Sequence, residues 1–199
     1  MIIGISGKAQ SGKDTVGSMI AYLKRAYNPT FQDYKSVSYV SKEGCYDWLW
    51  KHKYFALPLK ECISNILNCD IGDLNNQTFK ESKITWLDNI TVRDLLQKFG
   101  TGIRESIDPN FWVKTLFKDY NPDFENWVIT DVRFKSEAKA IKDKGGILIR
   151  VNKPSAGAGS HISEIDLDDY DGFDFIIENT GSLEDLYDKV SDYVSSSRS

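Results

Sequence analysis

A glycine-rich segment near the start of the chain carries the residues best suited to hold phosphate. The run Gly7–Asp14 reads Gly-Lys-Ala-Gln-Ser-Gly-Lys-Asp and fits the pattern G-x-x-x-x-G-K. Its glycines let the backbone curl so that several N–H groups point at phosphate oxygens, and the start of a helix adds partial positive charge. Lys13 can reach the β- and γ-phosphates, and Lys8 and Ser11 can assist. The alternative is a glycine-rich turn that only joins a strand to a helix.

Three oxygen-bearing residues are candidates for a Mg²⁺ ion beside these phosphates. The usual residue after the lysine is Ser or Thr, whose hydroxyl binds the metal, but here Asp14 stands there and Thr15 follows. Either Asp14 holds the ion through water or Thr15 takes part. Asp131 directly follows the apolar run Trp127–Thr130. Proteins with a phosphate-binding loop of this pattern commonly carry an acidic residue near Mg²⁺ at the end of such a strand. An aspartate that only caps the next helix is the alternative for Asp131.

Several arginines could neutralise a transferring phosphoryl group and an acceptor phosphate. Arg93 and Gln97 are four residues apart in an expected helix, so they share one face. Arg104 follows the turn at residues 100–102, and Arg133 stands two residues past Asp131. Arginine forks suit phosphate oxygens, and the ends of elements are where open α/β sheets place ligands. Taken singly, each is more often a solvated surface residue.

The chemistry that these residues predict needs no strong general base. A phosphate monoester has a second pKa of about 6, so it is largely a dianion and already a nucleophile at neutral pH. Catalysis is then positioning plus neutralisation of charge, with Lys13, Arg93, Arg104, Asp131 and Arg133 as the catalytic candidates. Asp131 is better interpreted as a metal or orientation residue than as a proton acceptor.

Alternating apolar strands and amphipathic helices surround these candidates. Strands are expected at residues 1–6, 53–57, 127–130, 147–151 and 173–177. Helices are expected at 13–27, from Pro58, from Thr91 to Phe99 with Gly100 as the stop, from Asp108, over 134–144, and after Ser182. Residues 30–52 fit a hairpin, a strand or a packed insertion equally. The pattern predicts an α/β fold with a mostly parallel sheet covered on both faces.

Composition limits the classes of protein. The chain has 199 residues with 41% hydrophobic residues, enough for one globular domain with a core. Its net charge of −4 does not favour a nucleic-acid partner, and no apolar run is long enough to span a bilayer. Three cysteines without metal-like spacing and two histidines argue against a zinc site and favour reduced thiols in the cytoplasm. An aromatic stretch at 46–50 could serve a homodimer or cover a sheet edge.

With these residues in hand, the chain resembles the phage deoxynucleoside monophosphate kinases of the P-loop nucleoside monophosphate kinase superfamily. The matching stretches are residues 6–15, 55–60, 92–101, 111–113, 130–133, 161–164 and 177–181. The aspartate directly after the P-loop lysine also resembles the pattern of that family. The resemblance implies a three-layer fold on a five-stranded sheet, ATP and Mg²⁺ as cofactors, deoxynucleotides as acceptors, and the host cytoplasm as location.

The resemblance also assigns residues within one domain, 1–199. It implies an acceptor-binding region at about 58–120 and a mobile lid at about 152–172. The ATP candidates are Gly7, Lys8, Ala9, Gln10, Ser11, Gly12, Lys13, Asp14, Thr15, Asn179 and Gly181, with the 179–181 turn beside the adenine. The acceptor candidates are Lys60, Arg93, Gln97, Arg104, Trp112, Asp131, Arg133, His161 and Glu164. The lid holds no arginine, so Arg133 and Arg150 are candidates to replace one.

Other interpretations stay open at the level of the sequence. Animal-type phosphomevalonate kinases look similar over several of the same stretches, so a non-nucleotide phosphate is an alternative acceptor. A regulatory module that binds ATP without transferring phosphate is another, although it would not need acceptor-side arginines. The bases accepted and the preference between ribose and deoxyribose are not predictable.

Overall fold

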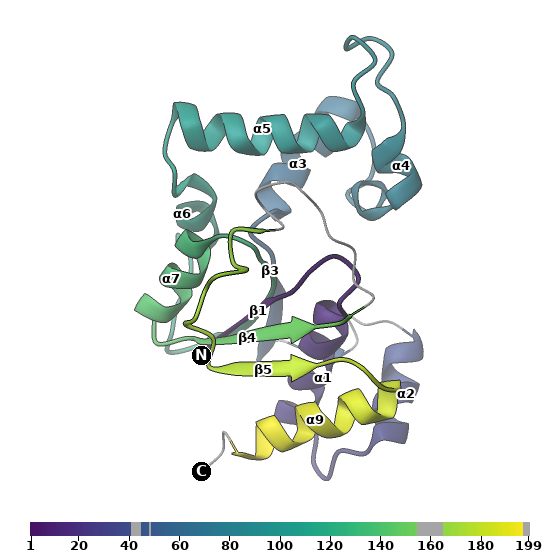
Figure 1. Ribbon diagram of the computed structural model, residues 1–199, viewed down its shortest axis with the longest axis vertical. Helices are drawn as coiled ribbons and strands as arrows, with labels where there is room; N and C mark the ends of the chain where they lie inside the picture. The colour runs from purple at the N-terminus through teal and green to yellow at the C-terminus, as the bar shows by residue number, and fades with distance from the viewer. Residues whose placement is uncertain (41–44, 48, 155–164, 197–199) are drawn as a thin grey trace. The chain divides into compact units, whose positions relative to one another are not determined.

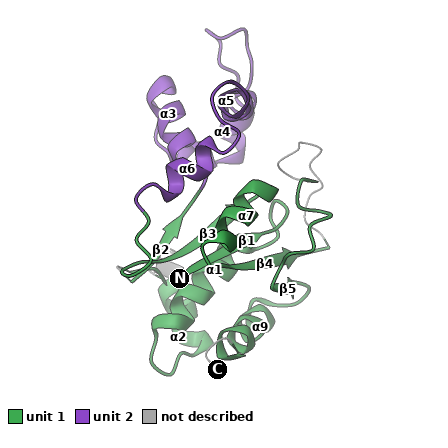
Figure 2. Ribbon diagram, turned by 90° about the vertical axis from the view of Figure 1, so that its left-hand side faces the viewer, with its two compact units in different colours: residues 1–54, 120–199 green, residues 55–119 purple. Residues whose placement is uncertain are grey.

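Figure 1 shows the computed structural model of the chain, which describes residues 1–40, 45–47, 49–154 and 165–196. The chain divides into two compact units (Figure 2). Unit 1 comprises residues 1–54 and 120–199, and unit 2 comprises residues 55–119. The bounds of unit 2 are close to the region expected to bind an acceptor, and that role stays a prediction.

A five-stranded parallel sheet forms the centre of unit 1. Its strands are β1 (Ile2–Ser6), β2 (Trp50–Lys53), β3 (Asn126–Val132), β4 (Ile147–Asn152) and β5 (Phe175–Glu178). They lie in the order β2-β3-β1-β4-β5, and every pairing is parallel. The α/β fold predicted from the sequence is therefore confirmed. The chain changes direction across the sheet at β1, and in such folds ligands bind beyond the carboxyl ends of the strands at this point.

Helices cover both faces of this sheet. They are α1 (Lys13–Arg25), α2 (Phe31–Val40), α7 (Lys135–Asp143) and α9 (Leu183–Ser196). Strand residues alternate between the two faces, so Ile3 and Ile5 pack with α1 and α9, while Gly4 lies against Ile141 of α7. Within the described ranges, none of the helices is both long and apolar enough to cross a membrane.

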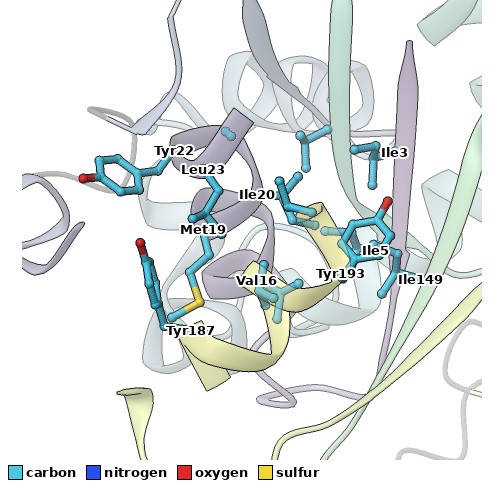
Figure 3. Packing of buried hydrophobic residues seen from close by; sticks show 14 of the residues in the cluster. Ile3, Ile5, Val16, Met19, Ile20, Tyr22, Leu23, Ile149, Tyr187 and Tyr193 are labelled. Carbon is cyan, nitrogen blue, oxygen red and sulfur yellow. The ribbon is translucent and has the colours of Figure 1, made fainter. Parts of the chain in front are cut away.

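The main core lies between the sheet and helices α1, α2 and α9 (Figure 3). Val16, Met19, Ile20 and Leu23 recur at helical spacing along α1 and are almost fully buried, as the sequence predicted. Tyr187 and its neighbours on α9 close this core from the other side. The packing fixes the start of α1 against the carboxyl end of β1.

Unit 2 is helical. It contains α3 (Leu57–Leu67), the short 3-10 helix η2 (Asp73–Asn75), α4 (Gln77–Glu81), α5 (Val92–Ser106) and α6 (Phe111–Phe117). Ile63, Leu74, Ile84 and Val92 form its own apolar cluster. Pro58 lies in the first turn of α3, as expected, because its missing N–H is not needed there.

Some expected boundaries were wrong. The second strand runs over Trp50–Lys53 and not over 53–57, because Phe55 is buried against Phe117 in unit 2 and Leu57 begins α3. Residues 31–40, left open by the sequence, form α2. The apolar residues Ile66 of α3 and Leu183 of α9 are 47% and 44% exposed.

Gly100 does not end a helix. Helix α5 continues through it to Ser106, and Gly100 is buried with Leu59 so close that an added Cβ would lie 3.2 Å from its Cδ2. The indole N–H of Trp112 donates to the Gly100 carbonyl at 3.0 Å. The glycine therefore permits close helix packing within unit 2 and is not a stop signal.

The start of α5 offers a test of local stability. Thr91 accepts a hydrogen bond from the Asp94 N–H at 3.0 Å, and Asp94 accepts one from the Thr91 N–H at 3.0 Å, which together form a capping box. Thr91→Ala should lower the free energy of unfolding by about 1 kcal/mol, because the helix N–H loses its partner. Denaturant unfolding measures this loss, and Thr91→Ser should stay near wild type. Equal losses in both variants would contradict the role of the hydroxyl.

Candidate active site

The loop between β1 and α1 has the backbone that a phosphate cradle requires. Gly12 has a φ of 96°, in the left-handed region, and an added Cβ would lie 2.7 Å from the Asn179 Nδ2. At Gly7 an added Cβ would lie 2.3 Å from the Ser11 Oγ. The Ser11 N–H donates to the Lys8 carbonyl at 3.1 Å and closes the turn. Both glycines are thus demanded by the curl of the loop.

Lys13 and Ser11 give this loop its chemistry. Lys13 is the first residue of α1, is 9% exposed, and donates from Nζ to the Lys8 carbonyl at 3.3 Å. The Ser11 side chain is fully buried, and its hydroxyl has no hydrogen-bond partner among the residues that the structure describes. Buried polar groups are nearly always paired, so an unsatisfied one next to a cation and a helix start is typical of a site completed by a ligand.

A cavity of about 410 Å³ opens beside the loop. Its lining consists of Gln10, Gly12, Lys13, Asp14, Thr15, Lys153, Asn179, Gly181, Ser182, Leu183 and Leu186. The Asn179 side chain donates to the Ser11 carbonyl at 2.9 Å, which ties the turn after β5 to the loop after β1. The structure therefore brings Asn179 and Gly181 to the cradle. Sequence reasoning missed Ser182, Leu183 and Leu186 as lining residues, since it interpreted this stretch only as the start of a helix.

The candidates for a metal lie around the start of α1 and the end of β3. The Thr130 hydroxyl donates to Asp14 Oδ1 at 2.5 Å, and Asp14 is exposed to the cavity. Asp131 is half-buried and stands where the pairing of β1 with β3 shifts register. The described residues include no cluster of three or more His, Cys, Asp or Glu side chains that could hold a metal alone. This donor set fits Mg²⁺, which usually takes one or two carboxylates, with phosphate and water completing its shell.

Two basic side chains near the loop converge on one carboxylate. Lys8 Nζ lies 2.5 Å from Asp168 Oδ2, and the Arg150 guanidinium lies 3.0 Å from Asp168 Oδ1. Arg150 also donates to the Ser6 hydroxyl at 3.1 Å. Burial raises the pKa of Asp168, but the hydrogen bonds from Lys8 and Arg150 outweigh it, so the net pKa is lowered. Arg150, a candidate to replace a lid arginine, is held by this pair of contacts.

The turn after β3 is built around a buried glutamate. The Glu137 carboxylate is 3% exposed and accepts the N–H groups of Arg133 and Phe134 at 2.8 and 3.1 Å. It caps α7, whose N-cap residue is Phe134, so Asp131 stands three residues before the cap position. The Arg133 side chain is half-buried, and its role in catalysis stays a prediction.

The acceptor candidates of unit 2 gather on α5. Arg93, Gln97 and Arg104 all belong to this helix, spaced by four and seven residues, so they share one face. Arg104 therefore lies in the last turn of the helix and not after a turn, as the sequence had suggested. Arg93 donates to Glu81 at 2.7 Å and to Gln77 at 2.7 Å.

Two further acceptor candidates of unit 2, Lys60 and Trp112, lie on other helices and make hydrogen bonds within the unit. Lys60 donates to Asn75 at 2.6 Å. Trp112 is 4% exposed and spends its indole N–H on Gly100, as a core residue does, so its contact with a substrate stays a prediction. His161, Glu164 and the rest of residues 155–164 in the expected lid fall outside the described residues.

The parallel sheet, the glycine loop after β1 and the lysine at the start of α1 define the class of P-loop α/β proteins. Within that class, the sequence profile of the deoxynucleotide monophosphate kinase family matches residues 45–190. The chain therefore belongs to the deoxynucleotide monophosphate kinase family. The resemblance noted from the sequence is confirmed.

Two phage proteins illustrate this relationship. The deoxynucleotide monophosphate kinase of Escherichia phage RB69 is 32% identical over 178 residues, which cover 86% of this chain and 62% of the relative. That of Enterobacteria phage T4 is 35% identical over 109 residues, which cover 52% of this chain and 45% of the relative. The chain thus spans less than two thirds of the length of either phage protein.

Proposed function

We propose that the protein transfers the γ-phosphate of ATP to a deoxynucleoside monophosphate and yields a deoxynucleoside diphosphate and ADP. The observation that carries this proposal is the cradle after β1. There, buried Lys13 and the start of α1 border a cavity large enough for a nucleotide, and the buried Ser11 hydroxyl of the same loop has no hydrogen-bond partner among the described residues. Membership of the family and the names of the phage relatives support the choice of acceptor.

The cradle residues supply binding and electrostatic stabilisation. Backbone N–H groups of residues 8–13 would hold the β- and γ-phosphates, and the Lys13 ammonium would neutralise charge that develops on the transferring phosphoryl group. Leu183 and Leu186 give the cavity an apolar wall beside Asn179, which suits the adenine ring. Mg²⁺, held through Asp14 with Thr15 and Asp131 as further candidates, would add positive charge at the phosphate oxygens when bound.

The acceptor phosphate needs cations of its own. Arg93, Gln97 and Arg104 on α5, together with Lys60 and Arg133, are the residues that we propose for it. An acceptor oxygen of the dianionic monoester attacks the γ-phosphorus as the bond to the β-phosphate bridging oxygen breaks, so no proton has to be removed first. His161 and Glu164 belong to this proposal through the family resemblance alone. A homodimer and the lack of a nucleic-acid partner stay predictions.

A coupled assay for ADP release tests the proposal directly. The enzyme is mixed with Mg²⁺ and ATP and then with dAMP, dCMP, dGMP, dTMP, the ribonucleotides or phosphomevalonate, each in turn. We expect turnover with at least one deoxynucleoside monophosphate, well above the rate with ATP alone, and chromatography should show the matching diphosphate. Turnover with phosphomevalonate alone would replace the acceptor, and ATP binding without any transfer would indicate a binding module.

A further inference from the structure

A line of hydrogen-bonded side chains runs through unit 1 to the P-loop aspartate. Tyr54 Oη lies 2.7 Å from His52 Nδ1, and His52 Nε2 lies 2.8 Å from Thr130 Oγ1. The Thr130 hydroxyl in turn donates to Asp14 Oδ1 at 2.5 Å. The four residues come from the start of α1, from β3, and from β2 and the residue just after it. Three segments far apart in the sequence thus meet at the carboxylate.

When the His52 ring is neutral, the hydrogen bonds in this line can point in one direction only. A carboxylate accepts and does not donate, so the single proton of the Thr130 hydroxyl goes to Asp14. The Thr130 oxygen must then accept from His52, which places the ring proton on Nε2. In the neutral ring Nδ1 is left as an acceptor, and Tyr54 is the donor that meets it. Each group therefore has one role, and the line fixes a tautomer as well as a position.

Close packing holds the line in place. The Tyr46 ring stacks on the His52 ring with centroids 4.5 Å apart and planes 14° apart. Gly17, three residues after Asp14 on α1, lets the helix approach β3, since an added Cβ would lie 2.6 Å from Thr130 Cγ2. Thr130 is fully buried as a result. Burying a hydroxyl costs free energy unless it is hydrogen-bonded, and valine would fill the same space without that cost. The Thr130 hydroxyl is therefore better explained by its hydrogen bond to Asp14 than by packing.

We propose that Thr130 and His52 are positioning residues that hold the Asp14 carboxylate in one orientation for the Mg²⁺ that accompanies bound ATP. This inference rests on the proposed function. A serine or threonine at the position of Asp14 reaches the metal with a short, restricted side chain, whereas aspartate has a second rotatable bond and two oxygens. The Thr130 hydrogen bond engages Oδ1 and so selects which oxygen faces the cavity. Groups that orient metal ligands in this way commonly change metal affinity about 10- to 100-fold when removed.

The test compares variants of Thr130 that differ only in the hydroxyl. Binding of a fluorescent ATP analogue is titrated without metal and then at increasing Mg²⁺ for wild type, Thr130→Val and Thr130→Ser. We expect Thr130→Val to raise the Mg²⁺ concentration for half-maximal enhancement about 10- to 100-fold, with metal-free affinity nearly unchanged, and Thr130→Ser to restore the wild-type value. Identical Mg²⁺ dependence in wild type and Thr130→Val, or equal defects in Val and Ser, would overturn the proposal.

A second comparison separates positioning from general damage. If Thr130 acts through Asp14, then Thr130→Val should add little to the defect of Asp14→Asn, and fully additive defects would contradict the proposal. His52→Gln, which keeps an N–H near the position of Nε2, should resemble wild type more than His52→Phe does. This pair serves as the test if Thr130→Val fails to fold, and equal Mg²⁺ dependence in the pair and wild type would then overturn the proposal.

Nitrogen NMR of the histidine rings tests the direction of these hydrogen bonds in the absence of nucleotide. The chain has two histidines, so His52→Gln assigns the spectrum by loss of one ring. We expect the His52 ring to be the Nε2–H tautomer in wild type and to lose that preference in Thr130→Val. An Nδ1–H ring in wild type would overturn the proposed direction of the hydrogen bonds. A wild-type protein that shows the expected tautomer but does not bind ATP would contradict the proposed function and the use of the line for Mg²⁺ while leaving its geometry intact.

Discussion

Lys13→Met is expected to lower the rate of phosphoryl transfer about 10²- to 10³-fold or more, while the fold survives. Lys13 brings the only cation within the run 9–15 of the loop, and it is 9% exposed at the edge of the cavity. Methionine keeps an unbranched stem of similar length, so the packing at the start of α1 is retained while the positive charge is lost. ADP release with saturating ATP and acceptor measures the rate, and thermal unfolding checks the fold.

A matched lysine on the same helix serves as the control for this variant. Lys24 lies in the last turn of α1, at the opposite end from the loop. Lys24→Met should leave the rate within about twofold of wild type, because it stands outside the phosphate cradle. Wild-type turnover in Lys13→Met would remove the P-loop from the mechanism. Equal losses in both variants would show that the substitution acts through the helix and not through the phosphate.

The elements of unit 1 that carry strong patterns were predictable from the sequence. The β-branched run at residues 2–6, the helical spacing after Lys13 and the strand before Asp131 each signal their structure locally. The boundary at residues 50–57 was not predictable from the sequence, because the aromatic and apolar residues there pack in two different units. Trp50 packs in unit 1 and Phe55 in unit 2, so the strand expected at 53–57 spanned the boundary between the two units.

The glycines led to both a confirmed and a wrong prediction from the sequence. Gly7 and Gly12 were interpreted as a loop, and the close approaches of Ser11 and Asn179 confirm it. Gly100 was interpreted as a stop, yet it lies inside α5, because the reason for its small size is a neighbouring helix that the sequence does not reveal. A glycine in a sequence indicates a position where a side chain does not fit. Only the fold shows whether the cause is the local backbone conformation or a neighbouring element.

The cradle was predictable from the sequence, but the residues that support it were not. The run 7–15 is contiguous, so its spacing alone indicated a phosphate site. The line from His52 through Thr130 to Asp14 depends on β2 lying beside β3 and on α1 crossing β3 at Gly17. His52 and Thr130 are 78 residues apart, and neither was a candidate for the site by its residue type or spacing. Such contacts become visible only once strand order is known.

Arg93→Ala is expected to raise the KM for the deoxynucleoside monophosphate about 10- to 100-fold, the range for loss of a hydrogen-bonded charged partner. The KM for ATP should change by about twofold at most, because ATP is proposed to bind at the cradle of unit 1. In the structure Arg93 bonds to Glu81 and Gln77, which hold its planar fork on the face of α5 that also carries Gln97 and Arg104. Steady-state kinetics with each substrate varied in turn separate the two effects.

Glu81→Gln distinguishes binding by Arg93 from the ion pair that it forms in unit 2. The pair is partly exposed, with side chains 39% and 60% accessible, so it should contribute about 0–1 kcal/mol to stability. If Arg93 binds the acceptor phosphate, removing the carboxylate that competes for its fork should leave the acceptor KM unchanged or lower it. A rise in Glu81→Gln equal to that in Arg93→Ala would mean that the ion pair shapes unit 2 and that Arg93 does not itself contact the acceptor.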